Sequence, residues 1–343
     1  MMRKVLVTGG TGYIGSHTTV ELQAAGYEVV IVDDLSNSAV DILDNIQKIT
    51  GKRPVFEQFN LVDAAKTDDF FGRHRDIAAT IHFAASKAVG ESVEKPLHYY
   101  RNNLVSLMNI IDAQLKYGIP NIVFSSSCTV YGQPDRLPVT ESTPRKDAES
   151  PYGNTKRVNE DILRDSIHAF PDRLRAIALR YFNPIGAHPS ALIGETPAGT
   201  PQNLVPFITQ TAAGLREELK VFGDDYDTPD GSAIRDYINV VDLAKAHVVA
   251  INRLLNNKNK TGFEVFNLGT GNGYSVLQLI NSFEKVTGLK LNYRIVGRRA
   301  GDIEKIWADT SLANNELGWK AEKSVEETLL SAWNWEKHLR GIA

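Results

Sequence analysis

A glycine-rich loop between two hydrophobic segments restricts the possible fold more than any other part of the chain. Residues 9–15 read Gly-Gly-Thr-Gly-Tyr-Ile-Gly, and they follow the continuously apolar run of residues 5–7. Such a run is typical of a parallel strand that helices cover on both faces. A helical stretch over about residues 16–25 comes next, and residues 28–32 form a second apolar run. This order predicts a β-α-β unit whose first turn is built from glycine.

The loop has the composition of a phosphate-binding turn. Gly9, Gly12 and Gly15 permit a tight turn and a close backbone approach, so a pyrophosphate can bind the N–H groups at the helix N-terminus. Asp33 ends the second strand, 18 residues after Gly15, where a carboxylate can bind both ribose hydroxyls. The same carboxylate would repel a 2′-phosphate. The pattern therefore predicts NAD rather than NADP as the cofactor.

Strands and helices continue to alternate beyond this unit. Further strands are expected at residues 55–59, 80–83, 122–124 and 176–180. Helices are expected between them, for example at residues 104–117. The alternation predicts an α/β protein with a doubly wound parallel sheet, in which ligands bind at the carboxyl ends of the strands. Residues 84–87 and 125–127 follow two of the strands, so we expect them to line this crevice.

Tyr152 and Lys156 form the second informative pattern. They are four residues apart, and such residues share one face of a helix. A nearby ammonium favours the phenolate, so we expect the pKa of Tyr152 to lie below its reference value of about 10. A phenolate near neutral pH is a general base suited to a sugar or alcohol hydroxyl. Three serines, Ser125, Ser126 and Ser127, lie a short way upstream, at the end of an expected strand.

Composition excludes several other classes of protein. A net charge of −3 gives no reason to expect nucleic acid or an anionic membrane surface as a partner. Cys128 is the single cysteine, so no internal disulfide and no cysteine-built metal site is expected. The histidines lack metal-ligand spacing, and no metal is predicted. The apolar start is too short for a signal peptide or a membrane span. We therefore expect a cytoplasmic protein.

Several ordered segments together resemble a known superfamily. Residues 7–15, 125–132 and 150–156 are similar to the extended short-chain dehydrogenase/reductase superfamily, which has a Rossmann-like sheet. Within it, the chain resembles the UDP-glucose 4-epimerase family through residues 87–92, 99–103, 179–184, 222–226, 235–238 and 298–302. The resemblance covers the chain from Val5 to about Trp335. Its specificity comes from many matches in order rather than from one short motif.

The resemblance implies a role for individual residues. Tyr152 deprotonates the sugar 4-hydroxyl, and Ser127 shares the hydrogen bonds around that hydroxyl. Lys156 lowers the pKa of Tyr152 and holds the nicotinamide ribose. The implied NAD-binding residues, besides these three and the glycines, are Tyr13, Ile14, Asp33, Asp34, Leu35, Ser36, Asn37, Ser38, Asn60, Leu61, Phe83, Ala84, Ala85, Ser86, Lys87, Asn102 and Phe182. The implied substrate-binding residues, besides Lys87, Ser127 and Tyr152, are Asn183, Asn203, Leu204, Lys220, Val221, Phe222, Arg235, Tyr237, Arg299, Asp302 and Ile306. Guanidinium groups also suit the diphosphate of a nucleotide sugar.

The implied activity is the reversible C4 epimerisation of UDP-galactose and UDP-glucose through a transient 4-keto sugar with tightly bound NAD. Epimerisation of UDP-N-acetylglucosamine and UDP-N-acetylgalactosamine is the main alternative. Relatives that use only unacetylated sugars carry a tyrosine at the position of Ile306, and those that accept both carry a small residue. Isoleucine is intermediate in size, so the residue leaves both substrates open.

Two further alternatives are less compatible with the sequence. Nucleotide-sugar 4,6-dehydratases carry an Asp-Glu pair directly after the position of Ser127, where this chain has Cys128 and Thr129. An inactive NAD sensor on the same fold would be expected to lack Tyr152 or Lys156, and both are present. The chain also departs from many relatives at Asn60, where an aspartate is common; asparagine keeps an acceptor but loses the charge.

The resemblance also implies the domain organisation. Residues 1–183 form the NAD-binding domain, with a returning segment at about 236–268, and residues 184–235 and 269–343 form a smaller C-terminal α/β substrate domain. A homodimer through the helices near residues 104–117 and 152–169 is implied by the family alone. A second glycine cluster at residues 269–273 has no acid-capped strand after it, so no second nucleotide site is expected. Two of the implied substrate-binding residues also have a purely structural interpretation. Asn203 could cap the helix that follows it, and Arg235 could form an ion pair with Asp236.

Overall fold

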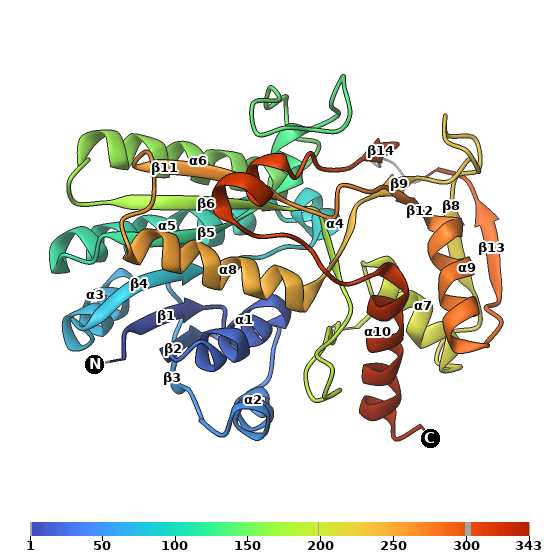
Figure 1. Cartoon of the computed structure of the whole chain (residues 1–343), viewed down its shortest axis with the longest axis horizontal. Helices are drawn as coiled ribbons and strands as arrows, with labels where there is room; N and C mark the ends of the chain where they lie inside the picture. The colour runs from blue at the N-terminus through green and yellow to red at the C-terminus, as the bar shows by residue number, and fades with distance from the viewer. Residues whose placement is uncertain (1, 198, 299–302, 343) are drawn as a thin grey trace.

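A seven-stranded parallel sheet forms the centre of the protein (Figure 1). The computed structural model describes residues 2–197, 199–298 and 303–342. The strand order is β11-β6-β5-β4-β1-β2-β3, and each neighbouring pair is parallel. The strands are β1 (Lys4–Thr8), β2 (Glu28–Asp33), β3 (Val55–Gln58), β4 (Ile77–His82), β5 (Asn121–Ser127), β6 (Arg175–Tyr181) and β11 (Phe263–Leu268). The predicted doubly wound sheet is confirmed.

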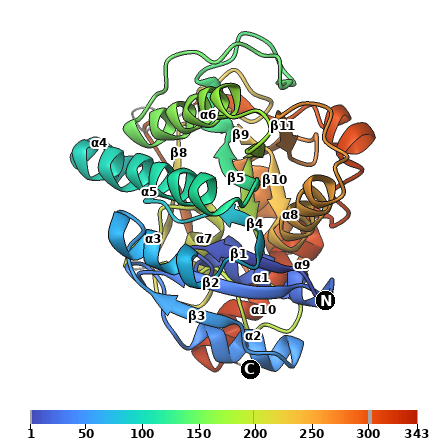
Figure 2. The same cartoon turned by 90° about the vertical axis from the view of Figure 1, so that its left-hand side faces the viewer.

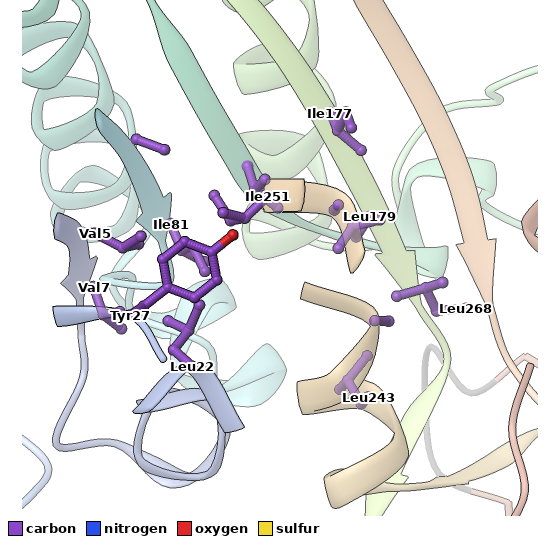
Figure 3. Close-up of a cluster of buried hydrophobic side chains, with 14 of the residues drawn as sticks. Val5, Val7, Leu22, Tyr27, Ile81, Ile177, Leu179, Leu243, Ile251 and Leu268 are labelled. Carbon is purple, nitrogen blue, oxygen red and sulfur yellow. The ribbon is translucent and has the colours of Figure 1, made fainter. Parts of the chain in front are cut away.

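Helices cover both faces of this sheet (Figure 2). Val5 and Val7 of β1 pack into one hydrophobic cluster with α1 and α8 (Figure 3), and Leu6, between them, packs into a second cluster with α5 and α6. This alternation explains why the run is apolar at every position. One face carries α1 (Tyr13–Ala24), α2 (Ile42–Thr50) and α8 (Val240–Leu255); the other carries α3 (Ala64–Arg73), α5 (Pro96–Tyr117) and α6 (Pro151–Ala169). The short helix α4 (Val89–Glu94) packs against α5 and α6.

The order of the strands reverses beside β1. From β1 the chain adds β2 and β3 on one side, and it then returns to add β4, β5 and β6 on the other. The switch point therefore lies between β1 and β4, and the loops that follow these two strands meet at the carboxyl edge of the sheet. Ligands of open α/β sheets bind at such a point.

A second group of elements lies beyond this carboxyl edge (Figure 1). Its core joins α7, β8, α9 and α10 around buried residues such as Ile208, Phe283 and Trp333. The elements are β7 (Asn183–Ile185), α7 (Leu204–Ala212), β8 (Leu219–Phe222), β9 (Ile234–Arg235), β10 (Tyr237–Asn239), β12 (Tyr274–Ser275), α9 (Val276–Thr287), β13 (Tyr293–Val296), β14 (Lys305–Ile306) and α10 (Val325–Arg340). The short helix η2 (Ala313–Leu317) instead packs on the central sheet, against β11 and α8. Three small sheets connect them, in the orders β10-β7, β12-β9-β14 and β13-β8.

Two helices begin earlier than the sequence predicts. Helix α1 begins at Tyr13 rather than near Ser16, because the Ser16 N–H already donates to Gly12 O at 2.9 Å. Gly15 therefore lies inside the helix. Helix α5 begins at Pro96 rather than near Leu104. Proline is favoured in the first turn of a helix because its missing N–H would have no partner there.

The returning segment also differs in detail from the prediction. Helix α8 packs on α1, as expected for a segment that returns to the sheet. Strand β10, directly before it, pairs with β7 in a small sheet of its own. The strand that rejoins the central sheet is β11, beside β6. Within the described part of the chain, every helix is too short or too polar to span a bilayer.

Candidate active site

The glycine loop packs tightly against the loop that follows β4. Gly9 has a φ of +68°, and a Cβ there would lie 2.8 Å from the backbone N of Ala84. A Cβ on Gly15 would lie 2.2 Å from Gly9 O. Both positions therefore require glycine, because a side chain would displace the turn. The result is a backbone cradle at the N-terminus of α1, directly beside the carboxyl end of β4.

Asp33 and the residues after it return to this cradle. The carboxylate of Asp33 is buried, and it accepts hydrogen bonds from the N–H groups of Thr11 at 3.2 Å and Leu35 at 3.0 Å. Ser38 Oγ lies 2.7 Å from Thr11 Oγ1. Residues 33–38 therefore lie beside the glycine loop, as predicted from the sequence, and the Asp33 carboxylate is held at the edge of that loop.

Asn60 is held by the neighbouring acid. Its Nδ2 donates to Asp34 Oδ2 at 2.8 Å, and its Oδ1 accepts from the Val62 N–H at 2.9 Å. The amide therefore pairs with a carboxylate that an aspartate at the same position would repel. Leu61 is buried in the second hydrophobic cluster. This arrangement explains how the departure at Asn60 is accommodated.

Ser127 and Tyr152 come from two elements that pack closely. Ser127 ends β5, and its Oγ accepts from the Thr129 N–H at 3.2 Å, which caps the short helix η1 (Cys128–Tyr131). Tyr152 lies in the first turn of α6, where the Ser150 hydroxyl accepts from the Gly153 N–H at 3.2 Å. A Cβ on Gly153 would lie 3.3 Å from Thr129 Cβ. The absence of a side chain at Gly153 thus lets α6 approach η1 and brings Tyr152 to Ser127.

Lys156 lies one turn further along α6 and is almost completely buried. Its Nζ donates to the carbonyl oxygen of Ser125 at 2.6 Å. The same atom lies 5.9 Å from the centre of the Tyr152 ring and 5.0 Å from that of Phe124. The predicted triad of Ser127, Tyr152 and Lys156 is therefore assembled at the carboxyl end of β5. Ser125 lies within β5 and contributes its backbone carbonyl to the site.

The electrostatics of this pair differ from the expectation. Burial raises the pKa of Tyr152 to about 12, while a hydrogen bond with Ser127 acts in the opposite direction. Burial lowers the pKa of Lys156 to about 7. The sequence predicted a phenol made more acidic by a full ammonium charge. The spacing places the two groups together, but burial penalises both charged forms and reverses the direction at Tyr152.

The lowered pKa of Lys156 gives a pH-dependent prediction. Between about pH 7 and the ordinary lysine pKa of 10.5, the unfolded chain binds a proton at this residue more readily than the folded protein does. The free energy of unfolding therefore rises with pH over this interval. Lys156→Met removes this term, so we expect its stability relative to the wild type to be highest near pH 7 and to fall steadily towards pH 10. Urea unfolding of both proteins across this range measures the difference in the free energy of unfolding. A difference that does not change with pH would contradict the lowered pKa of Lys156.

The loop after β4 is fixed by a residue that the sequence analysis did not select. Asn103, buried in α5, accepts from the Ser86 N–H at 2.8 Å and donates to Ser86 O and to Thr155 Oγ1, each at 3.0 Å. It thereby joins the loop to both α5 and α6. The predicted Asn102 donates to Ser86 Oγ at 3.2 Å. The sequence did contain a signal for Asn103, because this polar residue lies four positions after Tyr99 on the apolar face of α5.

On the substrate side, Ile306 lies opposite Arg235. The two residues pair across β14 and β9, and Ile306 is buried in a cluster with Cys128 and Phe182. Arg235 Nη1 donates to Ile234 O at 2.8 Å. One apolar wall therefore contains Cys128, Phe182 and Ile306. Cys128 follows Ser127, Phe182 is a predicted nicotinamide contact, and Ile306 is the predicted specificity residue. The sequence alone did not connect them.

The remaining predicted substrate residues are dispersed along the second group of elements. Lys220 and Phe222 are exposed on β8, and Val221 between them is buried. Asn183 begins β7, Leu204 begins α7 and Tyr237 begins β10. Arg299 and Asp302 lie outside the described residues.

Asn203 precedes α7 but does not cap it with its side chain. Its Nδ2 instead donates to Glu195 Oε1 at 2.7 Å, and the same oxygen accepts from Lys87 Nζ at 3.4 Å. Two predicted binding residues from distant segments thus meet at one carboxylate. Glu195 was not selected from the sequence.

The second glycine cluster (residues 269–273) binds one of the protein's own carboxylates. Asp236 is fully buried and accepts from the N–H groups of Thr270 at 2.8 Å and Gly271 at 3.1 Å. A Cβ on Gly269 would lie 2.3 Å from Asp236 Oδ2. The glycines therefore allow the loop to wrap an internal acid, the carboxylate of Asp236.

Comparisons with known proteins agree along nearly the whole chain. A family model described as GDP-mannose 4,6 dehydratase matches residues 6–331. A UDP-glucose 4-epimerase of Bacillus subtilis is 51% identical over 332 residues, which cover 97% of this chain and 96% of the relative. The mouse UDP-glucose 4-epimerase is 47% identical over 342 residues, covering 98% and 97%.

Solved structures give the same result. The UDP-glucose-4-epimerase of Stenotrophomonas maltophila, with bound NAD and formylated UDP-arabinopyranose, superposes with a TM-score of 0.95 at 48% identity and covers 99% of this chain and 100% of that one. The Bifidobacterium longum enzyme, in complex with NAD+ and UDP, has a TM-score of 0.94 at 46% identity, with the same coverage. The chain belongs to the UDP-glucose 4-epimerase family of the extended short-chain dehydrogenase/reductase superfamily.

Proposed function

We propose that the protein catalyses the reversible C4 epimerisation of UDP-galactose and UDP-glucose through a transient 4-keto sugar, with NAD tightly bound. The observation that carries this proposal is the assembly of Ser127, Tyr152 and Lys156 beside the glycine cradle, at the carboxyl edge of one sheet. Relatives at 47–51% identity over nearly the full length are named UDP-glucose 4-epimerase.

The cradle suits NAD. Gly9 and Gly15 leave space that a Cβ would fill, and the buried Asp33 stands where a ribose is expected. Two solved relatives contain NAD or NAD+. When bound, NAD supplies the hydride acceptor and donor for C4 of the sugar. The residues of the chain then have to orient the sugar, move the hydroxyl proton and keep water away.

Tyr152 is the proposed base for the 4-hydroxyl. Burial raises the pKa of Tyr152, and the hydrogen bond with Ser127 acts against this increase. The same serine can hold the substrate oxygen as the proton leaves. Lys156, fixed by Ser125 O, stands one helical turn away. A pKa of about 7 allows its ammonium to form when an anionic phenolate develops nearby. Tyr152 returns the proton once the opposite face of C4 has been reduced.

The residues after Ser127 distinguish this chemistry from dehydration. Elimination of water across C5 and C6 needs an acid and a base at the sugar. Here Cys128 and Thr129 follow the serine; burial raises the pKa of the Cys128 thiol to about 12, which leaves it protonated. Neither side chain supplies a carboxylate. The site therefore favours oxidation and reduction at one carbon, although the matching family model takes its description from a dehydratase.

We further propose that residues 1–183 and 236–268 hold NAD, and that residues 184–235 and 269–343 hold the UDP-sugar. The separate core around α7, β8, α9 and α10 supports this division. Epimerisation requires the keto sugar to turn over within the pocket. A firm hold on UDP and few polar contacts with the sugar permit this, and the apolar wall of Cys128, Phe182 and Ile306 is consistent with it.

We also propose a cytoplasmic homodimer. Exposed apolar side chains on α4 and α5, which include Val93, Leu97 and Met108, support burial of this surface against a second copy. A single cysteine is consistent with a reducing compartment.

The function is tested by incubating the purified protein with UDP-galactose, and separately with UDP-N-acetylgalactosamine, and resolving the products. We expect UDP-galactose to be converted to UDP-glucose and to be the better substrate. Conversion of the acetylated sugar alone would establish the alternative substrate class. Bound NAD without turnover of either sugar would contradict the proposal and favour a sensor.

A further inference from the structure

Glu195 joins the two halves of the proposed site. Its Oε1 accepts from Lys87 Nζ at 3.4 Å and from Asn203 Nδ2 at 2.7 Å. Lys87 lies in the loop after β4, on the cofactor side, and Asn203 immediately precedes α7, on the substrate side. The Glu195 side chain is 12% exposed, whereas that of Lys87 is 53% exposed. The carboxylate is therefore the fixed partner of the two, and the lysine reaches it from the mouth of the site.

The segment that carries Glu195 is held firmly by the C-terminal helix. Trp335 Nε1, on α10, donates to Glu195 O at 3.0 Å. A Cβ on Gly194 would lie 2.4 Å from the Trp335 ring, so the indole packs directly on this backbone. Ala187, which bridges to Gly194, is held by Ser331 Oγ at 3.0 Å. Helix α10 thus fixes the backbone, and the Glu195 side chain extends from it towards the site.

The cofactor side holds the same segment at its other end. Tyr13 Oη, from the first turn of α1, donates to Gly186 O at 2.6 Å. Lys87 Nζ lies 6.0 Å from the centre of the Tyr13 ring. The segment from Gly186 to Glu195 therefore spans from the glycine cradle to the start of α7, and its final carboxylate ties Lys87 to Asn203.

We propose that Glu195 is a positioning residue for the nucleotide sugar, which fixes the Asn203 amide and the Lys87 ammonium before the substrate binds. This inference rests on the proposed function. Without the carboxylate, the amide of Asn203 is free to rotate or to cap its own helix, and the lysine regains the freedom of a four-carbon side chain. Ordering both groups again would reduce the affinity for UDP. Glu195 makes no contact with Tyr152 or Ser127 among the described hydrogen bonds, so the chemical step should be spared.

The test compares Glu195→Ala and Glu195→Gln with the wild type. Calorimetry measures the Kd for UDP, and steady-state kinetics measure KM and kcat for UDP-galactose. For Glu195→Ala we expect Kd and KM to rise about tenfold, with kcat within about twofold. Glutamine keeps the acceptor for Asn203 but not the charge for Lys87, so an increase of about threefold is expected. A partial rescue of this kind is not expected if the residue serves only to hold the fold.

The outcomes separate this inference from the proposed function. Unchanged Kd and KM in Glu195→Ala, or a lower kcat with KM unchanged, would overturn the positioning role. If the wild type binds UDP but does not turn over UDP-galactose, the proposed function fails, while the UDP titration still decides the role of Glu195. If the alanine variant does not fold, the isosteric glutamine variant carries the test. Glu316→Gln removes an ion pair with Lys260 outside the site and should leave every value unchanged.

Discussion

Replacing Tyr152 with phenylalanine is expected to lower kcat for UDP-galactose by about 10²–10⁴-fold, the usual range for loss of a general acid–base group. The substitution removes the phenol oxygen and keeps the ring that packs in the first turn of α6. The glycine cradle and Asp33 do not depend on that oxygen, so the NAD content should stay at the wild-type level. Initial rates and the ultraviolet spectrum of the purified protein measure both quantities.

Tyr100→Phe is the matched control. Its phenol oxygen accepts from Asn154 Nδ2 at 2.8 Å, so the control also removes a hydrogen bond to α6. We expect its kcat to remain within about twofold of the wild type, because this bond lies on the side of α6 that meets α5. Near wild-type activity in Tyr152→Phe would show that another group takes the proton.

The second large effect is expected at Arg180, which belongs to a buried ion pair behind the catalytic residues. Its Nε and Nη2 donate to the two carboxylate oxygens of Glu160 at 2.9 and 2.7 Å. Glu160 is fully buried on α6, and Ser126 Oγ donates to it at 2.6 Å. The pair thus joins β6 to α6 and, through Ser126, to β5; α6 and β5 are the two elements that hold the catalytic groups.

Arg180→Met is expected to lower the free energy of unfolding by about 3–5 kcal/mol, because it leaves the Glu160 carboxylate buried without its principal partner. Arg145 Nη1, 3.4 Å from Glu160, offsets part of this loss and places the expected value near the lower limit. Urea denaturation followed by circular dichroism measures the change. Activity of the folded variant should also fall, because α6 would no longer be fixed to β6 by this pair.

Arg164→Met is the control for this experiment. Arg164 pairs with Asp161 at 2.6 Å on the same helix, but the two side chains are 46% and 40% exposed. Exposed pairs contribute about 0–1 kcal/mol, so little change is expected. Equal effects of the two substitutions would show that the buried pair has no special role in holding the site together.

Much of the fold follows from patterns that the sequence displays directly. The run of residues 5–7 alternates between two hydrophobic clusters, which is why it has no polar position. Glycine at positions 9 and 15 indicates a close contact between backbone segments, because any side chain there would prevent it. Both features appear in the sequence as residue types at fixed positions, even though Gly9 meets the distant Ala84.

The remaining features depend on contacts between distant segments. Spacing places Lys156 beside Tyr152, but the direction of the pKa change at Tyr152 depends on how deeply both groups are buried. Glu195 meets Lys87 and Asn203 only after three separate segments have folded together. No local pattern marks such a residue. Asn103 is an intermediate case, because a polar residue on the apolar face of a helix is visible in the sequence, although its partners are not.

The central claim is that one carbon of a UDP-sugar is oxidised and then reduced on its other face within a closed site. UDP-galactose carrying deuterium at C4, incubated with the purified protein in ordinary water, tests this most directly. Nuclear magnetic resonance of the product should show UDP-glucose that retains the deuterium at C4, because hydrogen is removed and returned without contact with solvent. UDP-glucose with C4 protium drawn from water would contradict the account, since it would require an exchangeable proton at that carbon.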